Sequence, residues 1–522
     1  MSNKSKYLLK VMLFFFAFAY VNKVFSDSRN LYFETYYRDT VPEIIITEGR
    51  LDSLFESFPK DDPWEKTKDA SALSWRESYT LNAFMDLYEA TGDIKYLKEV
   101  ESRGKRLLSH RDDKRGVVDG SGKSRPAWSM ASKYVVATGI LRNAQGDTVM
   151  VLQSTPSAYN NQTKIYVKPR PDQNTFDMTV VNEHFKREEH FENINLNSNS
   201  SRYIEKIVND PLAPYSTRSG TYYEKSNLVR VEYVNPRIGE IMKQSIELDP
   251  IPLAFMGYIG IIYEPLIRFS EIVANNSDLD QFDSSSKLFI RSAEESYMDA
   301  SQRLWVNGPN SNEGYYLMCE KGESMPADNV GQPFNYLGKH VSVELALYRI
   351  TGKIDYRIRA EKMANLFKNR LEYDAQKDLY IWNYWYEPMT TVGWKPEDSI
   401  SYNVKVFPGK ARTEDISHGA LDIALVMNAY SMGIEFSKKD VSRFANTLIK
   451  NVILENYIGV SRWVDGKGEY PGYFNALHRW LPLAKVVPDV YEHIEKAYFK
   501  RGEENFFFSA NLLKWKTKLG YN

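Results

Sequence analysis

Apolar residues recur at three- and four-residue spacing over two long stretches of the chain, at about 45–126 and 251–522. This spacing places them on one face of a helix, as packing against a core requires. The stretch between them, from about 134 to 250, is different. Its apolar residues are β-branched and aromatic and partly alternate with polar ones, as in 164–167, 176–181 and 228–234. This pattern predicts a small antiparallel sheet between two helical zones.

The helical zones repeat one helix–corner–helix unit. Residues 87–96 (LYEATGDIKY) match residues 347–356 (LYRITGKIDY), and each copy has Thr-Gly at the corner, where glycine supplies a left-handed C-cap. A looser third copy at 429–434 precedes a predicted helix over 439–452. Because one hairpin cannot bury its apolar face alone, the repetition predicts a repeat architecture. Independent use of a common corner is the alternative.

The N-terminus has the pattern of a secretory signal peptide. Three lysines within the first ten residues precede an apolar run at 11–21 that is too short to span a membrane. Small or medium-sized residues then predict cleavage near Ser26. The protein is therefore expected in the periplasm or outside the cell, and an uncleaved anchor is the alternative. No later run of about 20 apolar residues occurs, so no membrane contact is expected after cleavage.

These patterns divide the 522 residues into four segments. The segments are a signal peptide (1–26), the first helical hairpins (27–133), a β-rich insertion (134–250) and the remaining helical hairpins (251–522).

Composition narrows the classes of partner. The formal net charge is -1 and no long Lys/Arg stripe occurs, so nucleic-acid binding is not expected. Aromatic residues make up 14% of the chain, which indicates either large cores or rings that stack on sugars. The single cysteine, Cys319, excludes an internal disulfide and a cysteine-based zinc site, and we expect it to be packed.

The strongest candidate site lies at 411–422 (ARTEDISHGALD), just before a buried helix. Glu414, His418 and Asp422 are spaced by four residues and are expected to share a helix face. A carboxylate one turn from a histidine fixes its tautomer and raises its basicity, as general-base chemistry needs. Asp415 lies beside them at the helix N-terminus, where the helix dipole stabilises acidic groups.

An ordinary helix start, with Thr413 as its cap, is the alternative for this cluster. The presence of Arg412 next to the acidic residues favours a functional site. No metal is expected, because the Glu-x-x-x-His spacing lacks a clear third ligand.

A second cluster opens the helix of the second hairpin copy, at 331–340 (GQPFNYLGKH). Gln332 and Asn335 are candidates for binding a substrate carboxylate, which acidifies the adjacent carbon. Tyr336 is a candidate proton donor, and His340 supplies an imidazole. Packing of these side chains in the core is the alternative.

Three more groups extend the candidate surface. An offset of 260 residues between the copies (347 minus 87) aligns Trp75 with Asn335, so Trp75, Arg76 and Glu77 are expected at the same end. Arg76 is a candidate for bidentate carboxylate binding, and a buried Arg–Glu pair is the alternative. The remaining candidates, each also compatible with a core role, are sugar-stacking or loop-to-helix residues: Trp382, Tyr384, Trp385, Tyr473 and Arg479.

The hairpin corners, together with 332–335 (QPFN), 382–385 (WNYW) and 414–419 (EDISHG), resemble the (α/α) toroid carbohydrate-active proteins. They are similar to the glucuronyl C5-epimerase C-terminal type and to toroidal polysaccharide lyases. The likeness covers about 45–130 and 250–500. It implies a mainly α fold, an (α/α) toroid of helical hairpins, and leaves the inserted antiparallel β subdomain unexplained.

The resemblance implies an exported enzyme that acts on a uronic-acid polysaccharide by β-elimination or C5 epimerisation, without a cofactor. His418 would be base or charge neutraliser, and the acid–base pair would join Tyr336 or Tyr384 to His418 or His340. Asn335 and Arg412 would bind the carboxylate.

Two alternatives remain open. In a glycoside hydrolase of the same architecture, Glu414 or Asp415 would act as general acid or base, paired with Glu77 or another carboxylate. A non-catalytic glycan-binding protein of polysaccharide export would bind without turnover.

Overall fold

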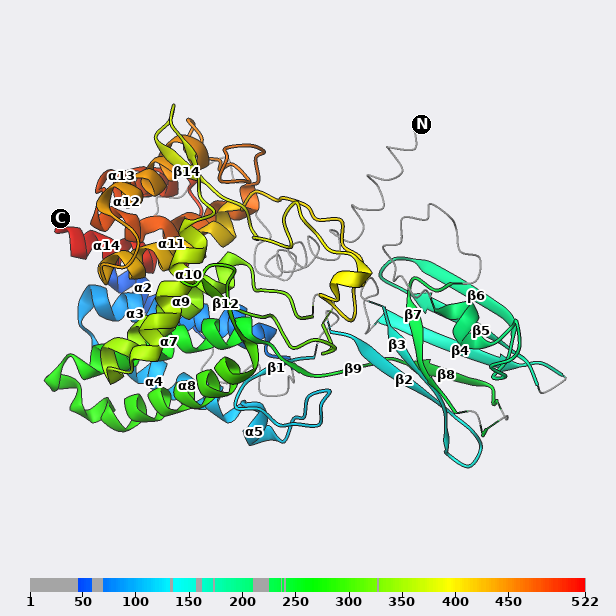
Figure 1. Ribbon diagram of the computed structural model, residues 1–522. Coiled ribbons are helices and arrows are strands. Elements are labelled where there is room, and N and C mark those ends of the chain that lie inside the picture. Colours follow the sequence, from blue (N-terminus) through cyan, green and yellow to red (C-terminus); the bar gives the residue numbers. More distant parts are fainter. Residues whose placement is uncertain are drawn as a thin grey trace.

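The structure is a computed structural model that describes residues 46–58, 69–131, 135–155, 162–171, 174–209, 225–235, 237–238, 241–325 and 328–521. It is about half helical, with several small sheets. A large helical unit and a separate β unit lie side by side (Figure 1). The predicted signal peptide at 1–26 lies outside the described residues. No helix among the described residues is long and apolar enough to cross a membrane.

The two matching hairpin copies fold alike. In the first, α3 (Ser78–Thr91) and α4 (Ile94–Ser109) meet at Gly92, and in the second, α9 (Phe334–Thr351) and α10 (Ile354–Lys368) meet at Gly352. Both glycines are left-handed, with φ of 75° and 71°. Each donates its N–H to the carbonyl of a tyrosine four residues earlier at 2.8 Å. The repeat in the sequence is therefore a repeat in geometry.

The third copy differs from its prediction at its far end. α11 (Ile416–Ser431) ends before Gly433, which is left-handed as expected. The following helix is α12 (Lys438–Thr447), and the predicted continuation to 452 is a π-helical turn, η5 (Leu448–Val452).

The remaining helical segments surround these hairpins. They are α2 (Glu48–Glu56), η1 (Leu73–Glu77), α5 (Asp112–Arg115), α7 (Met256–Ala274), η3 (Ser277–Phe282), α8 (Asp283–Leu304), η4 (Pro396–Asp398), η6 (Pro471–Lys485), α13 (Asp489–Arg501) and α14 (Phe506–Leu519). Two short hairpins join them, β11 (Trp305–Asn307) with β12 (Gly314–Tyr316) and β13 (Glu372–Asp374) with β14 (Leu379–Ile381).

Packing contacts between the inner helices run in a closed cycle. α3 packs on α7, α7 on α9, α9 on α11, α11 on η6, η6 on α14, and α14 on α3. A second helix covers several members from outside, as α4 covers α3, α8 covers α7 and α10 covers α9. The pattern of burial explains this order. α9 is buried continuously from 334 to 347, as an inner helix must be, whereas α4 buries one stripe.

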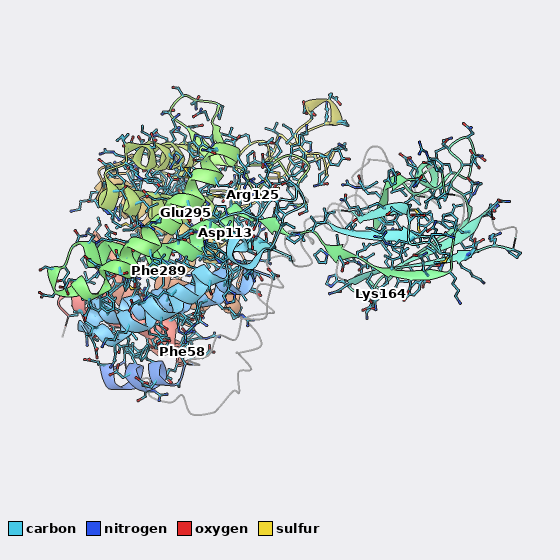
Figure 2. The ribbon with its side chains drawn as sticks, turned by 90° about the horizontal axis from the view of Figure 1, so that it is seen from below. Phe58, Asp113, Arg125, Lys164, Phe289 and Glu295 are labelled. Atoms are coloured by element: carbon cyan, nitrogen blue, oxygen red, sulfur yellow. The ribbon has the colours of Figure 1, made fainter. Side chains whose placement is uncertain are left out.

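Side chains fill the helical unit densely (Figure 2). Phe289 of α8 stacks edge-on with Phe269 of α7, with ring centroids 5.5 Å apart. Arg111 bridges Asp113 and Glu295, each at 2.9 Å, and so ties α5 to α8. Cys319 is fully buried, as expected.

The β-rich segment forms two four-stranded sheets. One has the order β7-β3-β2-β9 and the other β6-β5-β4-β8, and all neighbours are antiparallel. The strands are β2 (Ala137–Arg142), β3 (Thr148–Ser154), β4 (Thr163–Pro169), β5 (Phe176–Asn182), β6 (Arg187–Ile194), β7 (Val229–Val234), β8 (Gln244–Glu247) and β9 (Asp249–Pro250), with α6 (Ile204–Val208) after β6. The single predicted sheet is thus a pair. Alternation gives each sheet one apolar face, and the two faces cover each other in a core of their own.

The chain enters and leaves the β unit through one short pair of strands, β1 (Ser129–Met130) and β10 (Leu253–Ala254). Further contacts fix the unit to the helices. Val136 donates its N–H to the Ser324 carbonyl at 2.7 Å, and Arg230 of β7 donates to the Asn403 side chain at 2.9 Å.

Candidate active site

Asp415 is the N-cap of α11. Its Oδ1 accepts hydrogen bonds from the backbone N–H groups of Ser417 and His418, both at 3.0 Å. The expectation that Glu414 shares a helix face with His418 and Asp422 is wrong, because the helix begins at Ile416, and Thr413 is not the cap. The backbone before Ile416 is held extended, because Glu414 donates its N–H to the Trp382 carbonyl at 2.9 Å and Asp415 bridges to Trp463.

The residue that partners His418 is Asp415, three positions earlier, and not Glu414 as the spacing of four indicated. His418 Nδ1 lies 2.6 Å from Asp415 Oδ2. Burial opposes ionisation of Asp415, but its attraction to and hydrogen bonds with His418, and the nearby Arg412 guanidinium, hold the pKa of the carboxyl well below its usual range. An ionised carboxylate only accepts, so Nδ1 carries the proton and Nε2 is left as the basic nitrogen.

Two other groups contact the same carboxylate oxygen. The Tyr473 hydroxyl donates to Asp415 Oδ2 at 3.3 Å, and Arg412 Nη2 lies 3.4 Å from it. Asp415 is fully buried, whereas His418 is only partly buried. The carboxylate therefore lies behind the imidazole, on the protein side.

Glu414 and Asp422 form a second acidic pair beneath this dyad. Both are fully buried, and burial raises the pKa of each carboxyl well above its usual range, with the charge of Asp415 adding to both shifts. Trp382 donates its indole N–H to Asp422 at 2.8 Å, and Glu414 accepts the backbone N–H of Asp415 at 2.9 Å. Both carboxyls thus resist ionisation, next to Asp415, whose carboxyl ionises readily.

Aromatic rings flank the dyad. The Tyr384 ring centroid lies 5.3 Å from that of His418, at an interplanar angle of 62°. The Arg412 guanidinium lies 5.0 Å from the Tyr384 ring centroid and 5.3 Å from that of Trp463. Burial raises the pKa of Tyr384 well above its usual range, so its hydroxyl stays protonated. This wall combines a cation, two rings and a phenol donor.

Arg479 of η6 also lies next to the dyad. It donates to the Tyr79 hydroxyl at 2.9 Å and to Ser417 Oγ at 3.0 Å. Tyr79 stacks on Trp75, with centroids 6.2 Å apart and an interplanar angle of 17°. Trp75 in turn lies 6.0 Å from the Tyr336 ring of α9.

Residues from four parts of the inner ring therefore meet in one place. These parts are the continuous segment of η1 and α3, then α9, α11 and η6. Of the predicted candidates, the structure brings together Trp75, Tyr336, Tyr384, Arg412, Glu414, Asp415, His418, Tyr473 and Arg479.

Other predicted candidates lie in the core. Gln332 Oε1 is 3.1 Å from His340 Nε2, and His340 Nδ1 is 2.9 Å from the Tyr297 hydroxyl. Gln332 and His340 are fully buried, and burial lowers the pKa of His340 to about 3. Asn335 is also fully buried, and neither of its amide atoms has a hydrogen-bond partner among the described residues.

The last candidates have structural contacts. Glu77 accepts from Arg103 of α4 at 3.0 and 3.2 Å, so the buried Arg–Glu pair exists with a different arginine, and Arg76 is half-buried on η1. Trp382 and Trp385 are buried, and Trp385 donates to the Gly331 carbonyl at 2.9 Å. These two rings are core residues and not an exposed stacking wall.

Three contacting residues were missed by the sequence analysis. Ser417 and Tyr79 receive the hydrogen bonds of Arg479, and Trp463 stacks with Arg412. Tyr79 lies one helical turn after Trp75, a spacing that indicates a shared face. Trp463 carries no local signal, because a bridge to Asp415 brings it into place.

Glu414, Asp415 and His418 also form a group that can offer metal ligands. One atom from each lies within 4.8 Å of the others, in the part of the chain that the structure describes. The 2.6 Å Nδ1–Oδ2 contact is a hydrogen-bond distance, so a metal bound through Nδ1 has to displace that hydrogen bond.

No family model matches the chain, and no curated protein matches it. Among solved structures, the chain is similar to a family 76 glycoside hydrolase from a bovine Bacteroides thetaiotaomicron strain. The sequence identity is 10% and the TM-score 0.31, over 71% of this chain and 96% of that one. A TM-score this low defines neither fold nor activity.

Proposed function

We propose that this protein is an exported carbohydrate-active enzyme with an (α/α) toroid, which acts on a uronic-acid-containing polysaccharide by abstracting the C5 proton. The closed cycle of contacts from α3 through α7, α9, α11, η6 and α14 back to α3 supports the toroid. The gathering of aromatic and basic side chains where the inner elements begin supports a sugar site at that end.

The observation that carries the proposal is the 2.6 Å contact between His418 Nδ1 and Asp415 Oδ2. A buried ionised carboxylate holds the imidazole in one tautomer and stabilises the imidazolium that forms when Nε2 takes a proton. His418 is the partly exposed member of the pair, so the imidazole and not the carboxylate is the group that can meet a substrate.

The neighbouring groups match the other needs of this reaction. A proton next to a carboxylate is removed more easily when cations neutralise the carboxylate as charge develops. Arg412 contacts the Tyr384 ring and Arg479 donates to Ser417, the residue before His418, and guanidinium groups bind carboxylates bidentately. Tyr384 keeps its proton and can donate it to the leaving oxygen or return it to C5 from its side of the ring.

A glycoside hydrolase is the second candidate, and one observation favours it. The adjacent carboxyls of Glu414 and Asp415 have pKa values shifted in opposite directions, as a general acid and a general base require. In this reaction, Glu414 would give its proton to the glycosidic oxygen and Asp415 would be the base, but their carboxyl oxygens lie within 4.8 Å of each other, closer than the roughly 6.5–9.5 Å that leaves room for an attacking water. Burial of Glu414 beneath the dyad weighs against this assignment.

The experiment is to incubate the chain with acidic and neutral polysaccharides and read three products. Ultraviolet absorbance reports an unsaturated product, exchange of C5–H for deuterium reports epimerisation, and reducing ends without absorbance report hydrolysis. His418→Ala is expected to abolish the first two. The matched control is His493→Ala, which should keep full activity. His493 lies on α13, is partly buried and is hydrogen-bonded to Tyr457.

Two outcomes would contradict the proposal. Full activity of His418→Ala would show that His418 is not the base. Binding without turnover would favour a glycan-binding protein of polysaccharide export. Export itself is tested by sequencing the N-terminus of the mature protein recovered from the periplasm or medium. A mature chain that starts near 27 is expected.

A further inference from the structure

The outer face of the β6-β5-β4-β8 sheet has a groove that the proposed reaction does not use. Its volume is about 660 Å³, within the range of roughly 300–1,000 Å³ typical of ligand sites. The opposite face of this sheet packs on the other sheet, in the core of the β unit. The groove therefore belongs to the β unit alone, and none of the residues lining it comes from the helices.

An exposed tyrosine lies at the centre of the groove. Tyr166 of β4 is 46% exposed. It pairs across the sheet with Thr179 of β5 on one side and Ser245 of β8 on the other, and Thr179 pairs in turn with His190 of β6. Thr179 Oγ1 lies 3.2 Å from His190 Nδ1. Directly paired residues point to the same face, so the ring is flanked by hydroxyl groups and an imidazole.

This arrangement fits a sugar ring. An aromatic ring presents an apolar face to the C–H groups of a sugar, while flanking hydroxyl and imidazole groups hydrogen-bond to its hydroxyls. The row from His190 to Ser245 crosses all four strands, so the sheet offers room for more than one sugar unit.

The charges at one end of the groove select among sugars. Asp177 lies 2.7 Å from Arg170, and Glu192 lies 3.7 Å from it. Lys168 and Lys243 also line the groove and are exposed, and Lys168 is opposite Asp177 across the sheet. The three cations outnumber the two carboxylates at this end, so its charge complements an anionic ligand.

The other end is different. Lys164, two residues before Tyr166 on the same face, is labelled on the β unit in Figure 2. It pairs with Glu247 at 3.3 Å and lies 3.6 Å from Glu183, so its charge is already balanced. The positive charge of the groove is therefore concentrated at the Lys168 end.

We propose that this groove binds an acidic polysaccharide chain, with a sugar ring on Tyr166 and its carboxylate at Lys168 and Lys243. The ligand class follows from the groove itself. The claim that this ligand is also the substrate of the helical unit rests on the proposed function. The β unit then holds the polymer while the site at α11 acts on it.

The experiment is affinity electrophoresis of the full chain through gels that contain polygalacturonate, alginate or neutral dextran. Wild type is expected to be retarded by at least one of the acidic polymers, and less so as salt is added. Tyr166→Ala and the double variant Lys168→Gln/Lys243→Gln should each weaken that binding about tenfold. Tyr233→Ala, an equally exposed tyrosine on the other sheet, and Lys164→Gln are the matched controls and should bind as wild type.

A second comparison of variants distinguishes binding in the groove from turnover at the candidate active site. Arg412→Ala should lose turnover and keep retardation, whereas Tyr166→Ala should lose retardation and keep turnover of short oligosaccharides. Failure of turnover in the wild type contradicts the proposed function and leaves the binding result standing. Four results would each overturn the groove proposal. They are no retardation of the wild type, equal retardation by dextran, unchanged retardation of Tyr166→Ala, and loss of retardation in Arg412→Ala.

Discussion

Arg479 and Tyr79 are 400 residues apart in the chain and are joined by a 2.9 Å hydrogen bond at the mouth of the candidate site. The same guanidinium donates to Ser417, so it links η6 to both α3 and α11. The bond thus joins one of the first helices to one of the last across the site. Arg479 is both a candidate for substrate binding and a connection between elements that the chain alone leaves far apart.

Arg479→Lys should therefore reduce activity more than stability. Lysine keeps the charge but cannot direct two donors to Tyr79 and Ser417 at fixed angles. We expect kcat/KM on the acidic polysaccharide to fall about 10²-fold, roughly 2.7 kcal/mol of transition-state stabilisation. Arg357→Lys, whose partner Glu361 lies on an exposed helix face, is the control and should behave as wild type. A drop shared by both variants would count against a role of Arg479 at the site.

Asp415→Asn should impair proton abstraction while leaving α11 intact. Asparagine still caps the helix, because its oxygen accepts the N–H groups of Ser417 and His418. It removes the negative charge that stabilises the imidazolium and permits the wrong tautomer. A loss of about 10³-fold or more in kcat is expected, with a change of only a few degrees in melting temperature. A near-normal kcat would show that the dyad is not the base.

The buried pair of Glu414 and Asp422 predicts a pH-dependent stability. The pKa of each is raised in the folded state, so its stabilising effect is complete below about pH 4, the unfolded value, and is lost as the pH rises through the folded pKa. Asp422→Asn keeps an acceptor for Trp382 and removes this titration. Its melting temperature should exceed that of wild type by at least about 2 °C at pH 8, and the gain should disappear at pH 4.

Asp415 contributes with the opposite sign. Its pKa is depressed, so its contribution is present above about pH 4 and is lost as the pH falls through the folded pKa. Asp415→Asn should therefore lower the melting temperature at pH 7 more than at pH 3. Thermal melts of the two variants over this pH range check both signs, and equal behaviour of the variants would contradict the assignment of raised pKa values to Glu414 and Asp422 and a lowered pKa to Asp415.

Gly338 of α9 lies directly against the backbone of α11. A Cβ there would lie 2.6 Å from the Leu421 carbonyl oxygen, a backbone atom that cannot move alone. Gly338→Ala should destabilise the protein by about 1–3 kcal/mol. Gly49→Ala is the control, since nothing lies within 4 Å of its Cβ position in α2, and it should stabilise that helix by about 0.5–1 kcal/mol. Denaturant unfolding measures both, and equal effects would refute the packing argument.

Features set by local sequence were predictable. The corners at Gly92 and Gly352 follow from one residue that adopts φ > 0, and the strands of the β unit follow from alternation. The cluster around His418 was found because acidic residues and a histidine precede an apolar helix. In each case the signal lies within a few residues of the structure that it predicts.

Features set by distant contacts were not predictable. The cap is Asp415 and not Thr413, because Trp382 and Trp463 hold the preceding backbone extended. His340 lies at a helix start, as a site residue would, but Tyr297 from α8 and Gln332 enclose it. Tyr297 lies 43 residues before His340, so the sequence near His340 does not indicate its burial, and Trp463 is likewise brought into place by a distant contact.

The strand pair at Ser129 and Ala254 places the two ends of the inserted segment opposite each other. The path of the chain through the helical cycle is therefore nearly the same with or without the β unit, which is a side branch on a closed loop. Such a branch can be lengthened, shortened or replaced without rethreading any helix. Selection for a new polymer can thus act on the sheet face while the catalytic end keeps its geometry.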